Sequence, residues 1–160
     1  MPTIEFTVMI HAPIERCFDL ARSVDLHMLS TADTGERAIA GVTQGLMGLN
    51  DEVTWSARHF GVRQRLTSRI VAYDRPRHFR DSMVRGAFRR FDHDHFFEVR
   101  EDYTEMRDRF DFDSPFGPIG RLANMLVLTR YMRGFLERRN LIVKRVAESD
   151  EWRTVLRTNS

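Results

Sequence analysis

The 160-residue sequence contains one cysteine, Cys17, one lysine, Lys144, and only five prolines. A single cysteine allows no intramolecular disulfide and no cysteine-based zinc site, which favours a reducing compartment, and we expect a cytoplasmic location. The first ten residues alternate polar and apolar side chains and contain no long apolar run, so they do not resemble a signal peptide. Charges throughout the longest helical segment also argue against a membrane span.

The sequence has almost no excess of one charge sign, because 25 basic residues are balanced by 23 acidic ones and the net charge is only +2. We therefore expect no nucleic-acid partner. The sequence also lacks a phosphate-binding loop, a dinucleotide fingerprint and a G-x-S-x-G nucleophile elbow, and we expect no cofactor. The length and the 42% hydrophobic content indicate one ordinary domain, which we place at residues 1–148, with residues 149–160 as a tail. A homodimer is compatible with this composition.

Hydrophobic periodicity predicts an α+β domain. Alternation predicts a strand over residues 3–10, and helical spacing after Pro13 predicts two short helices, the second capped by Ser23. A short strand is expected over 37–41, and five successive strands over 51–112, with turns at 60–63, 74–77, 85–89 and 100–103. A broad apolar stripe then predicts one long helix over residues 119–148.

One face of the predicted sheet is mostly apolar and the other is almost entirely charged, so the charged face should meet water. Six polar side chains nevertheless fall on the apolar face: His59, Gln64, Asp81, His93, His95 and Asp108. The expected turn lengths place His95 opposite Asp108 and His93 opposite Asp81. On the outer face the same register places Asp94 opposite Arg109.

These inward polar groups allow several interpretations. A buried carboxylate must be paired, hydrated or bound to a ligand, so the set is either a structural hydrogen-bond network or part of a wet pocket. As acid–base machinery, the candidate catalytic residues are Asp81, His93, His95 and Asp108. The two imidazoles and a neighbouring carboxylate also offer metal ligands, but such spacing is common by chance, and we predict no metal.

The order of elements is similar to that of the START-like, or SRPBCC, superfamily over about residues 2–148. The resemblance rests on Ala12-Pro13-Ile14-Glu15-Arg16-Cys17-Phe18-Asp19, on the segments 55–64 and 88–95, and on Pro115-Phe116-Gly117-Pro118-Ile119-Gly120-Arg121-Leu122. The last three segments are similar to the bacterial cyclase/dehydrase-like branch. The resemblance implies a helix-grip fold, a curved antiparallel sheet wrapped around the long C-terminal helix, with a cavity between them.

Three functions follow as hypotheses. The first is a protein that binds a small hydrophobic ligand such as a lipid, a quinone or a polyketide. Its predicted ligand-binding residues are Trp55, His59, Gln64, Leu66, Asp81, Met83, His93, His95, Phe97, Met106, Asp108, Leu122, Leu126 and Met132. The second is a polyketide cyclase or dehydratase that uses the His-Asp pairs as general acid and base. The third is an interaction protein with a basic helix face made of Arg130, Arg133, Arg138, Arg139, Lys144 and Arg145.

Overall fold

The structure is a computed structural model that describes residues 2–114 and 121–157, with the backbone alone for residues 121–124. The strands of the described part are β1 (Thr3–Ile10), β2 (Arg37–Gly41), β3 (Glu52–His59), β4 (Val62–Asp74), β5 (His78–Arg85), β6 (Arg90–Val99) and β7 (Thr104–Asp113). The helices are α1 (Ile14–Ala21), α2 (Val24–Ser30), the 3-10 helix η1 (Ala32–Thr34), α3 (Arg121–Glu148) and α4 (Glu151–Arg157).

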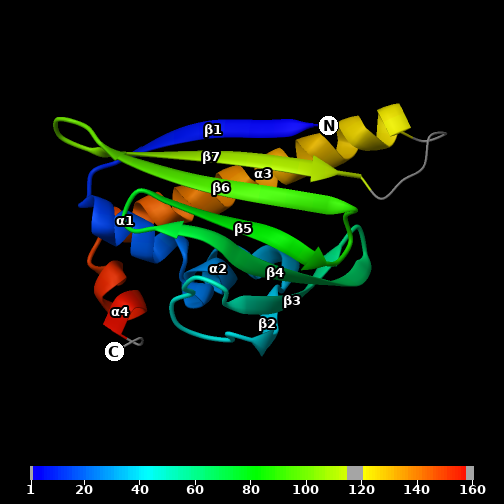
Figure 1. Ribbon diagram of the computed structural model, residues 1–160, viewed down its shortest axis with the longest axis horizontal. Coiled ribbons are helices and arrows are strands. Elements are labelled where there is room, and N and C mark those ends of the chain that lie inside the picture. Colours follow the sequence, from blue (N-terminus) through cyan, green and yellow to red (C-terminus); the bar gives the residue numbers. More distant parts are fainter. Residues whose placement is uncertain (1, 115–120, 158–160) are drawn as a thin grey trace.

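The strands form one antiparallel sheet in the order β1-β7-β6-β5-β4-β3-β2, so β1 lies beside the last strand (Figure 1). The predicted pairings are confirmed, with His95 opposite Asp108 and Asp81 opposite His93. Tight turns fix this register, because a slip of one residue would turn every side chain to the other face. The α+β helix-grip prediction is therefore confirmed.

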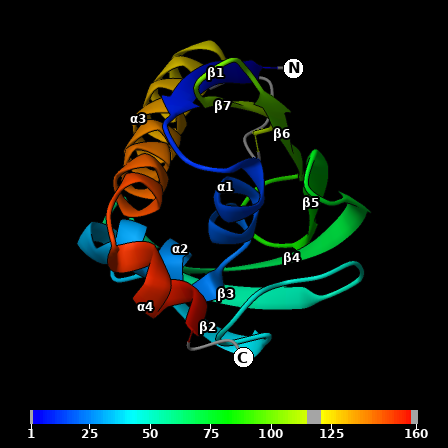
Figure 2. The ribbon, with the colours of Figure 1, turned by 90° about the vertical axis from the view of Figure 1, so that its left-hand side faces the viewer.

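The sheet curves so strongly that its strands bend around α1 when the molecule is viewed from one end (Figure 2). Helix α3 runs along the open side of the sheet, while α1 and α2 lie at the end that Figure 2 faces. Local sequence explains these short helices: α1 starts after Pro13, and the Ser23 hydroxyl accepts a hydrogen bond from the Leu26 amide at 3.2 Å. No described helix is both long and apolar enough to cross a membrane.

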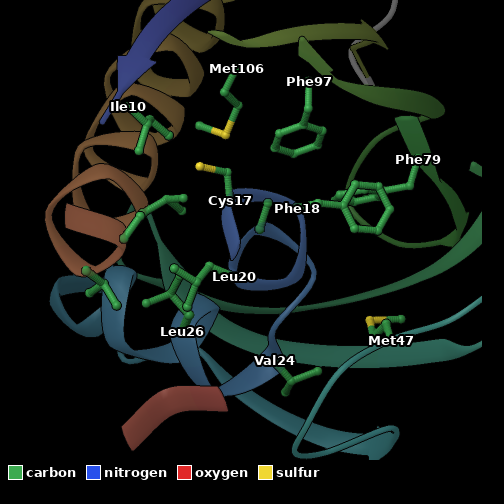
Figure 3. Packing of buried hydrophobic residues seen from close by; sticks show 14 of the residues in the cluster. Ile10, Cys17, Phe18, Leu20, Val24, Leu26, Met47, Phe79, Phe97 and Met106 are labelled. Carbon is green, nitrogen blue, oxygen red and sulfur yellow. The ribbon is translucent and has the colours of Figure 1, made fainter. Parts of the chain in front are cut away.

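Buried apolar side chains form two clusters along the molecule. We call the first the closed-end cluster, because it lies at the end of the molecule that α1 and α2 cover (Figure 3). It is centred on Phe18, whose ring contacts those of Tyr73, Phe79 and Phe97 edge-on, with 5.3–5.4 Å between ring centres. The open-end cluster contains Ile4, Phe91, Phe110, Phe112 and Leu136.

Helix α3 turns most of the predicted apolar stripe toward the sheet, with Met132 and Phe135 on a cavity wall and Val146 buried, but Leu126 points outward. Leu126 is 67% exposed, whereas Leu136 and Val143 are buried. Arg139, which we placed on a basic outer face, is 6% exposed and donates a hydrogen bond to the Ala21 carbonyl at 2.6 Å. The basic face of the third hypothesis therefore loses this arginine, because its guanidinium points into the fold.

The segment expected to be a tail contains helix α4. Trp152, Val155 and Leu156 pack against the closed-end cluster, and the Arg16 guanidinium lies 4.1 Å from the centre of the Trp152 ring. A cation over an aromatic face is attracted by the ring quadrupole, so this contact helps to hold α4 against α1. Seven residues gave too short a pattern for its helical period to be recognised.

Candidate functional site

Two cavities border inward side chains of the sheet. The larger of these two has a volume of about 160 Å³ and lies between the sheet and the first half of α3, and we call it the larger cavity. Most of its wall is apolar or aromatic. The lining residues are Glu36, Trp55, Ala57, His59, Phe60, Gln64, Arg65, Leu66, Ala87, Phe88, Leu128, Tyr131, Met132 and Phe135. An apolar wall with a few polar groups is the usual composition of a site for a small organic ligand.

The turn between β3 and β4 forms one edge of the larger cavity. Phe60 has φ +51° and Gly61 has φ +76°, so both central residues of this two-residue turn adopt the left-handed conformation. Asn and Gly are the residues that such a turn favours, and Phe is not. The Phe60 ring is 61% exposed but lies 4.7 Å from the ring of Tyr131. Phe60 is therefore an unfavourable residue for this turn, but its ring makes an aromatic contact at the edge of the cavity.

His59 and Tyr131 are the neutral polar pair of the larger cavity. His59 Nδ1 and the Tyr131 hydroxyl share a hydrogen bond of 2.6 Å. Burial lowers the pKa of His59 and raises the pKa of Tyr131. Both side chains are therefore uncharged near pH 7, and the pair suits a ligand with an uncharged polar group such as a hydroxyl.

Glu36 brings a negative charge to the same wall. Its side chain is buried, and its Oε2 atom lies 3.3 Å from His27 Nε2. Burial raises the pKa of Glu36, but the interactions with His27, together with smaller ones from His59 and Thr31, outweigh it and the net shift is downward. The His27 ring in turn stacks on Trp55, with 4.2 Å between ring centres. This carboxylate was not among the predicted site residues.

A second cavity of about 80 Å³ lies nearer the closed end, and we call it the smaller cavity. Trp55 borders both cavities. The other lining residues are Ala21, Arg22, Ser23, Val24, His27, Met47, Val53, Ser68, Ile70, Phe79, Asp81, His93, His95, Leu136 and Arg139. Asp81, His93 and His95 of the predicted His-Asp set thus border the smaller cavity, whereas Asp108 is fully buried and borders neither cavity. The larger cavity has different polar groups.

Two imidazoles and two carboxylates from three adjacent strands form one network, which we call the His-Asp cluster (Asp81, His93, His95, Asp108). His95 lies between the carboxylates, with Nδ1 3.1 Å from Asp108 Oδ1 and Nε2 3.1 Å from Asp81 Oδ1. The predicted His95–Asp108 pair is present. The predicted Asp81–His93 pair is in contact but too far apart for a hydrogen bond, because His93 Nδ1 lies 3.8 Å from Asp81 Oδ1. The other ring nitrogen of His93, Nε2, lies 3.4 Å from Asp108 Oδ2 and forms no well-formed hydrogen bond among the described residues.

Helix α3 holds the far side of the cluster. The Asn140 amide donates a hydrogen bond to Asp108 Oδ2 at 2.7 Å, and Arg139 Nη1 lies 4.0 Å from the same oxygen. Asp108 and Asn140 have no exposed surface, so neither can use water as a partner. Such mutual satisfaction is what a buried carboxylate requires.

The charges of the cluster follow from these contacts. Burial by itself lowers the pKa of His95, but the charge of Asp108 and the hydrogen bonds to both carboxylates outweigh it, and the pKa is raised. Burial and the neighbouring His95 lower the pKa of His93. Burial raises the pKa of both carboxyl groups, but the histidines outweigh it, and the net shift is downward for Asp81 and strongly downward for Asp108.

Several predicted ligand-binding residues lie elsewhere. Phe97 and Met106 are packed in the closed-end cluster, and Met83 packs against the open-end cluster, so none of the three borders either cavity. Leu126 is exposed on the outer side of α3, and the prediction for it is corrected. The side chain of Leu122 lies outside the described residues. On the outer face, Asp94 lies opposite Arg109 as predicted, and its carboxylate contacts His78 at 2.7 Å and Arg80 at 2.8 Å.

Nine residues of the larger cavity were missed by sequence reasoning: Glu36, Ala57, Phe60, Arg65, Ala87, Phe88, Leu128, Tyr131 and Phe135. The helical spacing of Leu128, Tyr131 and Phe135 was a usable signal, because three inward apolar or aromatic side chains recur one turn apart. Glu36 gave no such signal, since it lies in a short irregular connection before β2.

Comparison with known proteins places this cavity-bearing fold in a family. The family model described as "Polyketide cyclase / dehydrase and lipid transport" matches residues 1–148. The chain belongs to this family. The family and its fold are consistent with binding of a hydrophobic ligand. The search of curated proteins found no match to this chain.

Solved structures with the same fold come from distant relatives. Protein TTHA0849 from Thermus thermophilus is 19% identical and superposes with a TM-score of 0.72, covering 99% of this chain and 100% of that one. Ginseng major latex-like protein 151 from Panax ginseng is 13% identical, with a TM-score of 0.64, and covers 91% of this chain and 97% of that one. Ara h 8.0201 is 13% identical, with a TM-score of 0.58 and coverage of 89% and 97%. At these identities the likeness concerns the fold alone.

Proposed function

We propose that the protein binds a small hydrophobic ligand in the larger cavity, with a ring against the apolar wall and one uncharged polar group near His59 and Tyr131. The observation that carries this proposal is the hollow of about 160 Å³ lined by Trp55, Leu66 and Met132. Apolar cavities of about 150 Å³ accept benzene, so this one has room for a single six-membered ring. Reduced Cys17 is consistent with the cytoplasm as the proposed compartment.

The size of the cavity narrows the ligand class. A long acyl chain does not fit into a hollow of this volume, while a monocyclic compound does. A larger ligand, such as a quinone or polyketide, would place one ring inside and extend past Phe60, which borders the cavity and is exposed. We therefore favour a monocyclic phenol or a molecule that ends in one.

Binding without turnover is the form of the proposal that the His-Asp cluster favours. A general acid or base needs a ring nitrogen within reach of the substrate. His95 is 1% exposed and both of its nitrogens face carboxylates, and Asp108 has no exposed surface. A cyclase or dehydratase mechanism through these residues would have no open proton-transfer group toward the larger cavity.

The test uses p-cresol and toluene, two ring compounds that differ by one hydroxyl group. In a Trp152→Phe background Trp55 is the remaining tryptophan, and both compounds should change its fluorescence in a saturable way. We expect p-cresol to bind about fivefold more tightly than toluene, because one hydrogen bond contributes about 1 kcal/mol. Tyr131→Phe should remove that preference while leaving toluene binding unchanged.

Filling the hollow provides the control on location. Ala57 is buried and borders the larger cavity, so Ala57→Phe should abolish the fluorescence response to both compounds. Ala40→Phe adds the same ring at an exposed position of β2 and should not. If Ala57→Phe fails to fold, Met132→Trp fills the cavity from the helix side. A response that survives in the filled variants, or no response in the wild type, contradicts the proposal.

A further inference from the structure

The His-Asp cluster presents three ligand atoms to one point beside the smaller cavity. These are Asp81 Oδ1, one ring nitrogen of His93 and one of His95, and all three lie within 4.8 Å of one another. His95 Nε2 is 3.1 Å and His93 Nδ1 is 3.8 Å from Asp81 Oδ1. Ligands in a tetrahedral zinc site with bonds of 2.0–2.1 Å are about 3.3 Å apart, so the two separations from Asp81 Oδ1 need adjustments of about half an ångström or less.

The position of these residues on the sheet explains the convergence. His93 and His95 are two residues apart on β6, so their side chains leave the same face. Asp81 lies directly opposite His93 on β5, and Asp108 lies directly opposite His95 on β7. The register of β5, β6 and β7 therefore fixes the relative positions of these four side chains, and no loop residue is needed to bring them together.

Asp108 meets the other nitrogen of each ring. Its Oδ1 lies 3.1 Å from His95 Nδ1, and its Oδ2 lies 3.4 Å from His93 Nε2. Metal-binding histidines commonly direct their second nitrogen to a carboxylate, which fixes the tautomer and ring orientation. His93 Nε2 is buried and has no well-formed hydrogen bond among the described residues. A metal on Nδ1 would place a proton on Nε2, and that proton would point toward Asp108.

The two carboxylates of the cluster also favour a cation. Asp81 and Asp108 lie on either side of the two imidazoles, and Arg139 Nη1 lies 4.0 Å from Asp108. Buried carboxylates require partners of positive charge or hydrogen-bond donors, and a metal ion beside Asp81 would be such a partner. The smaller cavity beside the cluster offers space of about 80 Å³ for a further ligand such as water.

Sequence spacing alone predicts no metal, but the convergence of these atoms favours one. We propose that Asp81, His93 and His95 bind a divalent transition-metal ion of the zinc class, with Asp108 as the positioning carboxylate for both imidazoles. Two nitrogen ligands and one carboxylate oxygen suit zinc and iron(II) better than magnesium or calcium. This site is separate from the larger cavity, so it stands or falls independently of the ligand proposed there.

The experiment adds Zn²⁺ or Co²⁺ to the chelator-treated full chain. Isothermal titration with Zn²⁺ should give one site per chain, and X-ray absorption of the zinc complex should show two imidazoles and a carboxylate oxygen at about 2.0–2.2 Å. Co²⁺ should give the visible absorption bands of a four- or five-coordinate site. A zinc spectrum without imidazole ligands, or no binding to the wild type, overturns the proposal.

Variants assign the site to these residues. His93→Ala should weaken Zn²⁺ binding by more than about 100-fold, since loss of an outer partner alone costs about 10–100-fold. Asp108→Asn keeps all three ligands, so it should weaken binding by about 10–100-fold and shift the Co²⁺ bands, which a loss of folding stability alone would not do. The matched control is His78→Ala, which removes a histidine from the His78–Asp94 pair on the outer face and should leave Zn²⁺ affinity unchanged.

Circular dichroism of each variant shows whether it is folded. Should His93→Ala fail to fold, the absorption spectrum of the wild-type zinc complex decides alone. Equal weakening by His93→Ala and His78→Ala would contradict the assignment, because it would place the ion on surface histidines.

Discussion

The two cavities both border Trp55, yet their polar groups differ in charge, in partners and in origin. The larger cavity has the uncharged His59–Tyr131 pair against an apolar wall, whereas the smaller one borders the His-Asp cluster. In the larger cavity, polar groups are few and a ligand can meet them. In the smaller one, most polar atoms already have protein partners, so substitutions there should affect stability before they affect binding of an organic ligand.

The largest expected effect is on the stability contributed by the His-Asp cluster. Asp108→Ala leaves His95, Arg139 and Asn140 without their common acceptor, and we expect the free energy of unfolding to fall by about 3–5 kcal/mol. Urea denaturation measures this change, with Asp108→Asn as the milder variant. A loss below about 1 kcal/mol would contradict the view that the cluster is a tightly coupled network.

A smaller effect is expected on ligand affinity at the larger cavity. Phe60→Asn places a favoured residue in the β3–β4 turn, so the protein should be as stable as the wild type or more stable. Loss of the aromatic ring beside Tyr131 should still weaken p-cresol binding by about 0.5–1.5 kcal/mol, or roughly two- to tenfold. Parallel urea denaturation and fluorescence titration separate the two effects. Unchanged affinity would remove Phe60 from the proposed site.

The pair formed by Asp94 and Arg80 on the outer face tests whether the strong coupling in the His-Asp cluster requires burial of both partners. Burial raises the pKa of Asp94, but hydrogen bonds from Arg80 and His78 outweigh it, and the pKa is lowered. A lowered carboxyl pKa gives stability that is present above the unfolded value of about 4 and is lost as pH falls through the folded value. The Asp94 side chain is only 4% exposed, but its partner Arg80 is 43% exposed and keeps contact with water, so Asp94→Asn should cost about 1 kcal/mol at pH 7.

The pH series provides the check on this pair. The difference in unfolding free energy between wild type and Asp94→Asn should shrink as pH falls below about 4, where the wild-type carboxyl takes up a proton. A difference that grows with acidification would mean that the carboxyl is destabilised in the folded state. That result would contradict the direction of the pKa shift.

The smallest effect is expected on the outer side of α3. Leu126 is exposed, so Leu126→Ser should change the free energy of unfolding by less than about 0.5 kcal/mol and leave p-cresol binding unaffected. Leu128→Ser, two residues later on the cavity side, is the matched comparison and should weaken binding. Equal effects of the two variants would show that the helix phase is wrong.

The sheet was largely predictable from sequence because its signals are local. Alternation in residues 3–10 and 51–112, together with short turns, specifies strands and register. It predicts that His95 lies opposite Asp108, as it does in the structure. The same alternation identified Trp55, His59, Gln64, Leu66, Asp81, His93 and His95 as inward side chains that border one of the cavities.

What failed depended on contacts between distant segments. The phase of α3 was misassigned at Leu126 because Arg139 and Asn140 lie on its inner side, where their partners come from α1 and β7. Charged and amide residues on an inner face obscure the helical period. Sequence alternation also could not distinguish two cavities, since side-chain packing decides that Phe97 and Met106 fill space that was predicted to be hollow.

The most direct test of the central claim is methyl NMR of the wild-type protein with ¹³C-labelled methionine, titrated with p-cresol. Met132 borders the larger cavity, Met47 borders the smaller one, and Met106 is fully buried in the closed-end cluster. We predict a saturable shift of the Met132 methyl signal, with those of Met47 and Met106 nearly unchanged. A shift centred on Met47, or no shift of Met132 at saturating p-cresol, would contradict a ligand site between the sheet and the first half of α3.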